Sequence, residues 1–501
     1  MKKILIIVAA FFVLQHNAQA QNNPEIIGKI DSVITVVMHD WEIPGMAVAI
    51  LKDNELIHKK GFGTKSPEQF LPVDENTVFQ IGSVSKSFTA ALIAMLVDEE
   101  KLKWSDKVID HLPDFKMYDS LATKSLLVRD IMTHRSGLRG QAGTCMPNLG
   151  YDRDDIYRLL AHIKPQTELR STYAYNNITF VIAEKLIEKY TGKSWEQNVK
   201  ERIFEPLGMT NSSMNEEGFL ASEDRSMACE FDYDNGIKKH WLYDDDQALF
   251  WLTVIGPAGS INSTATDLIK WSKFHLNKGK VDGKEIISEK NMKYLHTGQL
   301  ITSMDSARIT VYGQCWFIEQ TNRYRLYFHT GTTWGFTTLC AFVPELELGI
   351  VILANSETPS APRYSIMRSA IDLFKYGNIE KDYHAEMFAE FIKDEEESAA
   401  KRKEKPAEEF VECWSIDKYT GKFHNEILGD AEIKIENEKL FITIGKKGWA
   451  SELKHANNHK FKFRMQGHDF PLTFIVDDDA ISAFDIDYGY NENFGQWEKK
   501  D

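Results

Sequence analysis

Cysteine is scarce in this chain of 501 residues, and its five cysteines form no Cys-x-x-Cys pair. Closely spaced cysteine pairs are typical of zinc sites, redox motifs and small disulfide-rich domains. The spacing therefore indicates no disulfide framework, and we expect most of the cysteines to be buried as small apolar residues, with a single bridge left open. The five are Cys145, Cys229, Cys315, Cys340 and Cys413.

Positive charge is also in deficit, because 59 Lys and Arg face 74 Asp and Glu, which gives a formal net charge of −15 at pH 7. Nucleic acids and anionic membrane surfaces attract proteins mainly through Lys and Arg. We therefore expect no nucleic-acid partner and no binding to an anionic lipid surface. The composition, with 43% apolar and 27% charged residues, is otherwise that of a folded globular protein.

Long apolar runs are missing except near the N-terminus, where Ile4–Leu14 follows Lys2 and Lys3 and precedes Ala18-Gln19-Ala20. A membrane-spanning helix needs about 20 apolar residues, and this run is shorter. A charged start, a short apolar stretch and small residues before a cleavage site are typical of a secretory signal peptide. We expect residues 1–20 to be a cleavable signal peptide and the protein to be secreted or periplasmic, without stable membrane insertion.

Two widespread hydrolase motifs are absent. The chain contains no Gly-x-Ser-x-Gly, so an α/β-hydrolase triad is not supported, and no His-Glu-x-x-His of zinc peptidases. His455 and His459 have a His-x-x-x-His spacing, but they lie in the polar stretch KHANNHK, where a solvated turn is the commoner explanation. The sequence therefore indicates no metal site.

Strand patterns enclose a helical middle in the first three quarters of the chain. Gly45–Lys52 and Leu56–Phe62 predict a hairpin that turns at Asp53-Asn54. Helical patterns dominate from residue 86 to about 275, and strand patterns return after them. This order predicts an α+β fold over residues 21–380, with a mixed antiparallel sheet flanked by helices and an inserted all-helical domain.

Two further segments follow this domain. Residues 381–410 are rich in charge, and we interpret them as a solvated helix or a linker that marks a boundary. Residues 411–501 alternate short strand patterns with turn residues. That alternation predicts a small C-terminal antiparallel β-domain that is barrel-like.

A polar stretch, Gly82-Ser83-Val84-Ser85-Lys86, leads directly into an apolar helix. Ser-x-x-Lys alone is a weak signal, but here it places Ser83 and Lys86 on one helix face, and a buried helix start offers N–H groups that favour a developing oxyanion. A buried Lys can lose its proton and act as a base toward a neighbouring Ser. Helix capping by serine, with Lys86 solvated, is the structural alternative.

Two later motifs place polar groups next to predicted elements. Tyr175 and Asn177 precede an apolar helix, where a packed aromatic ring and a helix cap are the structural alternatives. His329-Thr330-Gly331 ends a predicted strand, where Gly331 allows a close approach of the backbone to a ligand. A tight turn is the alternative there. Each pattern by itself is compatible both with a functional site and with a purely structural role.

The order of the three motifs resembles the serine β-lactamase and penicillin-binding superfamily, which includes class C β-lactamases, DD-peptidases, D-aminopeptidases and esterases. Longer stretches resemble landmarks of the same family, in matching order, from about residue 27 to 375. The tail from residue 411 resembles the lipocalin-like domain appended to some of these hydrolases. The stretches are IPGMAVAILKDNELIHKKGFG, DIMTHRSGL, IFEPLGMTNSSM, GPAGSINSTATDLIKW and GFTTLCAFVPELELGIVILAN.

The resemblance implies a catalytic group of three side chains. Ser83 would attack the substrate carbonyl and form an acyl-enzyme, while Lys86 and Tyr175 would share the proton transfer, with Tyr175 reaching the leaving group. The backbone N–H groups of Ser83 and Thr332 would form the oxyanion hole. Asn177 would bind the acyl side chain of the substrate or Lys86. The resemblance implies no metal and no organic cofactor.

The His329 position departs from the family pattern, because it is commonly Lys in β-lactamases and penicillin-binding proteins, where its charge helps to hold a substrate carboxylate. Histidine is largely neutral at pH 7. With Thr330 and Gly331, His329 would line the strand that binds the substrate. The resemblance thus implies a serine hydrolase that acts on a peptide, amide or ester bond of a small-molecule or peptide substrate, with a D-aminopeptidase, DD-peptidase or esterase placed ahead of a β-lactamase or an acyltransferase.

An alternative from another class is a non-catalytic protein that binds a cell-wall fragment. Several features leave the substrate open. Aromatic residues are candidates for the pocket lining, although packing in the core or on the surface is the commoner place for each. The C-terminal β-domain has three open roles, namely capping the site, restricting substrate size and forming oligomers. The candidate aromatics are Tyr151, Trp251, Trp316 and Trp334.

Overall fold

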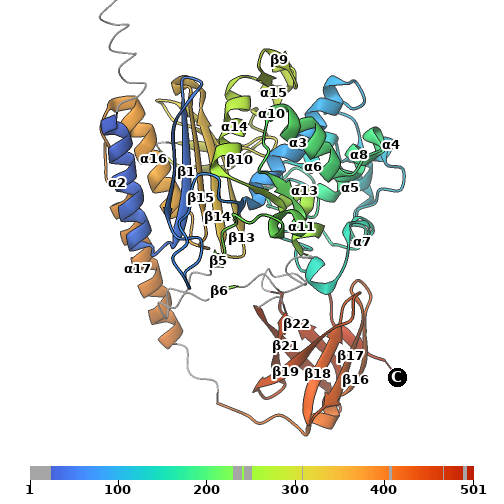
Figure 1. Cartoon of the computed structure of the whole chain (residues 1–501). Coiled ribbons are helices and arrows are strands. Elements are labelled where there is room, and N and C mark those ends of the chain that lie inside the picture. The colour runs from blue at the N-terminus through green and yellow to red at the C-terminus, as the bar shows by residue number, and fades with distance from the viewer. Residues whose placement is uncertain are drawn as a thin grey trace, which may run out of the picture.

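The computed structural model describes residues 24–229, 240–241, 251–306, 308–404, 409–465, 468–488 and 494–500. The expected signal peptide over residues 1–20 lies outside these ranges. Within them, no helix combines the length and the apolar character that crossing a membrane requires. The chain forms a sheet layered with helices, a helical domain and a β-barrel (Figure 1).

An eight-stranded antiparallel sheet forms the centre of the main domain, in the order β10-β11-β12-β13-β14-β15-β1-β2. The hairpin predicted near the N-terminus is present, and Asp53 and Asn54 in its turn have φ angles of 50° and 66°, as a two-residue turn between twisted strands requires. β1 pairs with β15, so the N-terminal strands close the sheet formed by the later ones. The strands are β1 (Gly45–Lys52), β2 (Glu55–Gly63), β10 (Leu300–Met304), β11 (Ile309–Tyr312), β12 (Phe317–Gln320), β13 (Arg325–Thr333), β14 (Phe336–Val343) and β15 (Leu348–Ala354).

Three helices cover one face of this sheet: α2 (Pro24–Asp40), α16 (Ala361–Tyr376) and α17 (Tyr383–Glu404) (Figure 1). The charged segment therefore contains a helix, which is one of the two forms expected for it. Phe388 and Phe391 of α17 pack on Trp41, with ring centroids 5.2 and 4.7 Å apart. These aromatic contacts attach α17 to the main domain.

The opposite face carries α14 (Ala265–Leu276) and the inserted helical domain, which surrounds α3 (Ser85–Asp98). Almost every residue of α3 is buried, and its Phe88 stacks on Trp271 of α14 with centroids 4.1 Å apart. The predicted α+β fold is confirmed. Further helices are α4 (Val108–His111), α5 (Ser120–Ser125), α6 (Val128–Ile131), α7 (Arg153–Leu159), α8 (Phe180–Thr191), α9 (Trp195–Val199), α10 (Glu205–Leu207), α11 (Asn215–Leu220), α13 (Gly256–Gly259) and α15 (Glu289–Leu295). Short strands in this part are β3 (Phe79–Gln80), β4 (Ser213–Met214), β5 (Ala228–Cys229), β6 (His240–Trp241), β7 (Ile261–Ser263), β8 (Lys280–Val281) and β9 (Lys284–Glu285).

Strands β16 to β23 form a closed antiparallel barrel, which confirms the predicted C-terminal β-domain. Inward-facing aromatic rings fill it, and Phe484 contacts both Phe423 and Phe474 with centroids 4.9 and 6.0 Å apart. The barrel thus has a packed interior of its own. Its strands are β16 (Gly421–Asn425), β17 (Gly429–Glu436), β18 (Lys439–Ile444), β19 (Trp449–Asn457), β20 (Lys460–Met465), β21 (His468–Asp477), β22 (Ala480–Ile486) and β23 (Trp497–Lys499).

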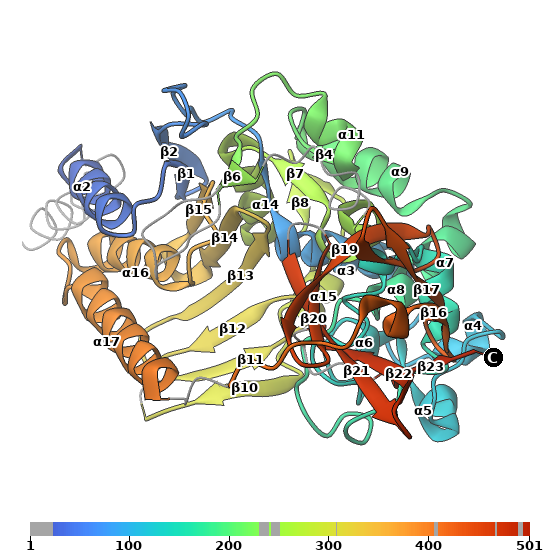
Figure 2. The same ribbon diagram turned by 90° about the horizontal axis from the view of Figure 1, so that it is seen from below.

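The barrel docks on the helical domain beside α7, away from the layer of α2, α16 and α17 (Figures 1 and 2). The Tyr151 hydroxyl donates to the Leu428 carbonyl at 2.6 Å, and the Lys446 N–H donates to the Leu149 carbonyl at 2.8 Å. The Lys446 ammonium also pairs with Asp155. Because backbone groups take part on both sides, the docking is specific in register as well as in charge.

Candidate active site

Ser83 lies in a short 3₁₀ turn, η1 (Gly82–Val84), that leads into α3 beside strand β13. Two glycines let these backbones approach. A Cβ on Gly331 would lie 1.9 Å from the Ile81 carbonyl oxygen and 3.1 Å from the Ser83 nitrogen. A Cβ on Gly82, whose φ is 50°, would lie 2.9 Å from the Thr332 nitrogen. The approach brings the Ser83 and Thr332 backbones together, as a pair of oxyanion-hole donors requires.

Arg363 of α16 holds the opposite side of the same peptide group. Its Nη1 donates to the carbonyl oxygens of Gly331 and Thr338, each at 2.9 Å. The Gly331 carbonyl and the Thr332 N–H belong to one trans peptide, so they point in opposite directions. Arg363 therefore fixes the direction of the Thr332 N–H. Burial lowers the pKa of Arg363 to about 10, so the guanidinium stays charged at pH 7.

Lys86 is fully buried one helical turn after Ser83. Its Nζ donates to Ser83 Oγ at 3.0 Å, to Asn177 Oδ1 at 2.7 Å and to the Ala258 carbonyl at 2.8 Å. All three acceptors are uncharged groups. Burial lowers the pKa of Lys86 from its usual value to about 7, because no carboxylate compensates for the lost water. The structure therefore contradicts the alternative in which Lys86 is solvated.

Tyr175 precedes α8 and lies over Lys86, whose Nζ is 4.8 Å from the ring centroid. Burial raises the pKa of the phenol well above its usual value, and a hydrogen bond with Ser83 offsets only part of this increase. The ring packs on His134 with centroids 4.1 Å apart, and His134 Nδ1 accepts the Asn176 N–H at 3.1 Å. The sequence stretch DIMTHRSGL contained His134, but its contact with Tyr175 was not anticipated.

The side chain of Asn177 is oriented by a second amide. Its Nδ2 donates to Gln141 Oε1 at 3.2 Å, which leaves Oδ1 to accept from Lys86. Of the two partners that the resemblance implied for Asn177, the structure shows the contact with Lys86. Gln141 was not anticipated either, because it lies on a loop with no motif of its own.

His329 lies on β13 and is 1% exposed. Its Nδ1 is 2.6 Å from the Thr330 carbonyl, which can only accept, so Nδ1 carries the proton and Nε2 accepts the Tyr312 hydroxyl at 2.9 Å. Burial, with a smaller contribution from the Lys86 charge, lowers the pKa of His329 to about 3. At neutral pH the ring is therefore uncharged, and both of its nitrogens are engaged.

These groups border a cavity of about 770 Å³, a size typical of sites for small ligands. Ser83, Tyr175, Asn177, His329, Thr330 and Thr332 line it from the main domain. Trp251 and Trp334 also line it, with ring centroids 4.6 Å apart. Tyr151 and Trp316 do not, since Tyr151 bonds the barrel and Trp316 packs on His275.

The barrel supplies part of the cavity wall, which the sequence did not reveal. The start of β21 and the residues that follow β22 reach the cavity from the docked barrel. Capping the site was one of the roles left open for this domain. Because barrel residues line the cavity, the barrel lies at the site. The barrel residues that line the cavity are Asp469, Phe470, Pro471, Asp487 and Tyr488.

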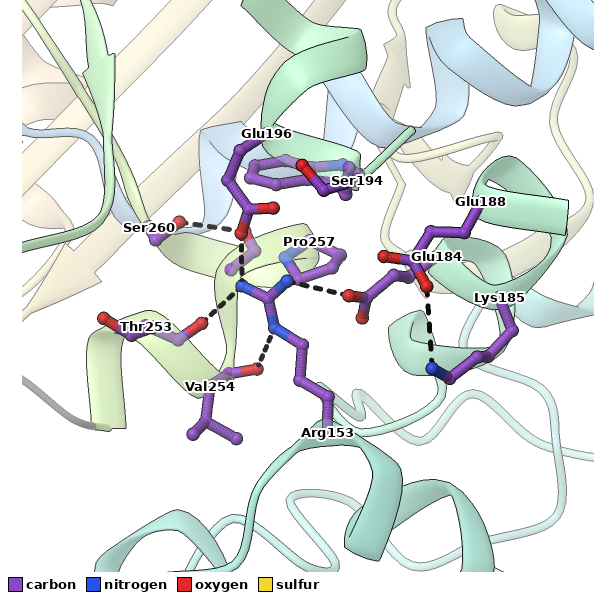
Figure 3. A network of polar contacts seen from close by, with 12 residues as sticks. Arg153, Glu184, Lys185, Glu188, Ser194, Glu196, Thr253, Val254, Pro257 and Ser260 are labelled. Carbon is purple, nitrogen blue, oxygen red and sulfur yellow. Dashed lines mark hydrogen bonds and ion pairs between the residues drawn. The ribbon is translucent and has the colours of Figure 1, made fainter. Parts of the chain in front are cut away.

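Another wall of the cavity, around Ile255, is held from behind by Arg153 of α7 (Figure 3). The guanidinium pairs with Glu184 at 2.8 Å and Glu196 at 2.7 Å, and its Nε donates to the Val254 carbonyl at 3.1 Å. A Cβ on Gly256 would lie 2.0 Å from Arg153 Nη2, so the guanidinium fits here only because this residue has no side chain. Arg153 thus connects the helix that adjoins the barrel with the segment that lines the cavity.

Two further sequence observations have structural outcomes. His455 lies in β19 and His459 in the turn after it, where His459 Nδ1 and the Tyr419 hydroxyl are 2.8 Å apart. Across the described ranges, no three His, Cys, Asp or Glu side chains gather as they would around a metal ion. Four cysteines are buried and Cys413 is half-buried, which agrees with the expectation of small apolar residues.

The comparisons with known proteins agree with the fold. The model of the family described as Beta-lactamase matches residues 30–371, and a domain of unknown function, DUF3471, matches residues 405–497. A solved structure, the octameric penicillin-binding protein homologue from Pyrococcus abyssi, superposes with a TM-score of 0.63 at 23% identity and covers 92% of this chain and 98% of that one.

Curated relatives are distant. An unguisins hydrolase of Aspergillus campestris is 28% identical over 341 residues, which is 65% of this chain and 60% of the relative. Penicillin-binding protein 4 of Amycolatopsis lactamdurans is 26% identical over 63% of this chain and 82% of its own length. The chain spans less than two thirds of several of these relatives, protein flp of Staphylococcus aureus among them at 64%. Since the family model matches more than half of the sequence, the chain belongs to the beta-lactamase family.

Proposed function

We propose that this protein is a serine hydrolase that cleaves a peptide, amide or ester bond of a small substrate through an acyl-enzyme at Ser83. The contact of Ser83 Oγ with the buried Lys86 Nζ at 3.0 Å carries this proposal. A lysine whose pKa is about 7 is partly neutral at physiological pH, and only the neutral amine can accept the Ser83 proton.

The first half of the reaction forms the acyl-enzyme. Lys86 takes the proton of Ser83 as Oγ bonds to the carbonyl carbon, and the backbone N–H groups of Ser83 and Thr332 stabilise the oxyanion. Tyr175, whose raised pKa keeps its phenol protonated, donates a proton to the departing amine or alcohol. Lys86, now protonated, then returns this proton to the Tyr175 phenolate, which restores the phenol and the neutral amine.

The second half releases the acid. A water molecule enters the cavity, gives its proton to the Tyr175 and Lys86 pair, and adds to the ester carbon. The bond to Ser83 Oγ breaks, and Oγ recovers the proton. Transfer of the acyl group to another acceptor would use the same intermediate, and a panel of acceptors would detect it.

The neutral His329 favours a peptidase or an esterase over a β-lactamase. A buried imidazole with both nitrogens engaged offers no charge to the carboxylate that β-lactams carry. Rapid hydrolysis of a chromogenic cephalosporin would reverse this order. Export through residues 1–20 stays a prediction alongside the proposed activity.

The test replaces Ser83 with Ala and measures hydrolysis of nitrophenyl acetate together with labelling by a fluorophosphonate. We expect both to be lost. Ser398→Ala is a matched control, because Ser398 and Lys401 have the same spacing on α17, far from the cavity, and this variant should keep wild-type rates. The proposal would be rejected if pure Ser83→Ala hydrolysed the ester at the wild-type rate. It would also be rejected if the fluorophosphonate never labelled the wild-type protein, a result that would favour a binding protein.

A further inference from the structure

Arg363 is a buried cation whose hydrogen bonds all go to uncharged groups. It lies in the first turn of α16 and is 2% exposed. Its Nη1 donates to the Gly331 and Thr338 carbonyls at 2.9 Å, and its Nη2 donates to the Ser360 hydroxyl at 3.4 Å. Its Nε is buried without a hydrogen-bond partner among the residues that the structure describes. In the described part of the chain, no carboxylate pairs with this guanidinium.

This position is unfavourable for a cation in two respects. A buried charge without a counter-charge is costly, and a guanidinium cannot avoid the cost by losing its proton at neutral pH. The N-terminal end of a helix also repels positive charge, and the first turn of α16 contains no acidic residue. Arg368 on the same helix has the usual solution, because it donates to both oxygens of the Glu319 carboxylate at 3.1 and 2.8 Å. Since departures from such rules are concentrated at functional sites, the unpaired charge of Arg363 points to a role at the active site.

The contact with the Gly331 carbonyl connects Arg363 to the oxyanion hole. Gly331 and Thr338 are paired residues of β13 and β14, so one nitrogen of Arg363 joins the two strands at the peptide that carries the Thr332 N–H. Hydrogen bonds in a chain polarise one another, and a charged donor strengthens this effect. A cation on the carbonyl oxygen of the Gly331–Thr332 peptide therefore makes the N–H of that peptide a stronger donor to an oxyanion.

His329 and Lys86, the other basic side chains described at this site, do not supply a constant positive charge. His329 stays neutral because burial lowers its pKa to about 3. Lys86 is neutral when it accepts the Ser83 proton and charged afterwards, so its charge changes during the reaction. Arg363 remains charged throughout, and it does not line the cavity. Its charge therefore reaches the substrate through the peptide that it binds.

We infer that Arg363 is a positioning residue for the oxyanion hole, which fixes the Gly331–Thr332 peptide and, through that peptide, stabilises the oxyanion with its unpaired charge. Arg363 neither gives nor takes a proton, so the bond changes are those of the acyl-enzyme mechanism. The inference rests on the proposed hydrolase function, because it concerns the transition states of that reaction. The structural alternative is that Arg363 only attaches α16 to the sheet.

The first experiment separates the rate at each site from the number of folded sites. Arg363→Gln removes the charge, and Arg363→Lys keeps the charge without the planar fork. Competent sites are counted by fluorophosphonate labelling to completion, and the acylation and deacylation rate constants for nitrophenyl acetate are measured per site. Arg363→Gln should lower both rate constants by about 10- to 100-fold, somewhat less than the loss of a whole oxyanion-hole donor, because an oxyanion forms in each step. Wild-type rates at a reduced number of sites would show that Arg363 acts on stability alone, and would overturn the inference.

Arg368→Gln combined with Glu319→Gln is the matched control. This double variant removes the other buried arginine of α16 without leaving a carboxylate unpaired, so it alters the contact of the same helix with β12. Both rate constants per site should stay at the wild-type value. A fall as large as that of Arg363→Gln would mean that any loosening of α16 affects Ser83, and would contradict a specific role of Arg363.

The second experiment tests the charge itself and does not require Arg363→Gln to fold. In Arg363→Lys the introduced ammonium has the same uncharged surroundings, so burial should lower its pKa below the usual value of about 10.4. The kcat/KM of this variant, divided by that of the wild type, should then fall by about tenfold between pH 7 and pH 9. Protonation of Lys86 is common to both proteins and cancels in this ratio. A ratio that stays level would mean that the charge has no part in the reaction.

The third experiment observes the polarisation in the acyl-enzyme. Nitrophenyl cinnamate with a ¹³C-labelled carbonyl is reacted at pH 8, the pH is lowered to 5 to slow deacylation, and infrared difference spectra are recorded. Weaker hydrogen bonding in Arg363→Gln should move the carbonyl band to higher wavenumber, with Arg363→Lys between this variant and the wild type. An unshifted band in both variants would sink this inference and leave the proposed function standing. A wild-type protein that forms no acyl-enzyme at Ser83 would reject the proposed function, and the inference with it.

Discussion

Lys86, which is fully buried, and Arg153, whose side chain is 15% exposed, are two cations of the main domain with different surroundings. Lys86 bonds only uncharged acceptors, namely the Ser83 hydroxyl, the Asn177 amide and the Ala258 carbonyl. Arg153 bonds two carboxylates, those of Glu184 and Glu196. The consequence is visible in the pKa values, because burial lowers that of Lys86 to about 7, whereas the two carboxylates outweigh burial and raise that of Arg153.

The difference separates a group that exchanges a proton from one that maintains structure. A buried charge costs several kcal/mol unless it is paired, and an amine can avoid the cost by losing its proton. Lys86 has this option, so its environment makes it a base at neutral pH. Arg153 lacks it, because guanidinium does not deprotonate in proteins, and it holds the wall of the cavity instead.

Removing the side chain of Lys86 should have the largest effect on activity. Lys86→Met keeps the length of the side chain but abolishes the base, and we expect kcat/KM for nitrophenyl acetate to fall by about 10²- to 10⁴-fold. Lys401→Met, at the exposed lysine of the Ser398 and Lys401 pair on α17, is the control and should have no effect. A Lys86→Met protein that is folded by circular dichroism and fully active would show that another group removes the Ser83 proton.

Replacing Arg153 should act first on stability. Arg153→Met leaves Glu184 and Glu196 without their cation, and breaking such a buried pair costs about 3–5 kcal/mol of unfolding free energy. Burial already raises the pKa of Glu184 to about 7, so the carboxyl is protonated below that pH and its unpaired charge disappears. The loss should therefore be smaller at pH 5.5 than at pH 8, measured by urea unfolding at both.

The double variant Arg153→Met with Glu184→Gln tests the pairing itself. It should recover part of the loss at pH 8, because it removes one of the two uncompensated carboxylates. A loss that is the same at both pH values and in both variants would mean that Arg153 contributes through packing and the Val254 hydrogen bond alone.

The pH dependence of turnover should report Lys86. Because the neutral amine is the active form and its pKa is about 7, kcat/KM should be level above this value and fall about tenfold per pH unit below it. The ester is uncharged, so the profile reflects the free enzyme. A level profile from pH 6 to pH 8 would contradict the role of Lys86.

Buried histidines limit how far this profile can be followed. Burial lowers the pKa values of His134, His275, His296 and His329. In the unfolded chain these groups take up protons below about pH 6.5, whereas the folded protein keeps them neutral, so stability falls as the pH decreases below that value. Unfolding curves at each pH separate this loss of folded protein from protonation of Lys86.

The sequence predicts those parts of the molecule whose cause is local. The hairpin at Asp53-Asn54 follows from two residues that tolerate positive φ between alternating strands. The juxtaposition of Ser83 and Lys86 follows from one helical turn, although the sequence left open whether Lys86 is solvated or buried. Both rest on residues within four positions of each other.

The rest of the site depends on contacts that no local pattern contains. His329 is neutral because burial lowers its pKa, and its Nε2 accepts from Tyr312, which reaches it from another strand. Arg363 reaches the Gly331 carbonyl from a helix more than thirty positions along the chain. The barrel residues at the cavity come from strands whose own pattern predicts only a β-domain. The docking at Leu149 and Lys446 sets which end of the barrel meets the site. The part of the cavity wall that the barrel supplies was therefore not predictable from the sequence.

The smallest effect we predict tests the space that Arg153 needs. Gly256→Ala would place a Cβ 2.0 Å from Arg153 Nη2, so the guanidinium must shift, and we expect a loss of about 1–3 kcal/mol in unfolding free energy. Gly28→Ala is the control, because Gly28 lies in α2 with nothing within 4 Å of an added Cβ, and helix propensity alone should stabilise it by about 0.5–1 kcal/mol. Lys86 bonds the Ala258 carbonyl of the same short helix, but a Cβ on Gly256 points at Arg153. The Gly256→Ala profile of kcat/KM against pH should therefore keep its midpoint near 7. A shifted midpoint with unchanged stability would mean that the two buried cations are coupled, and the contrast between them would then fail.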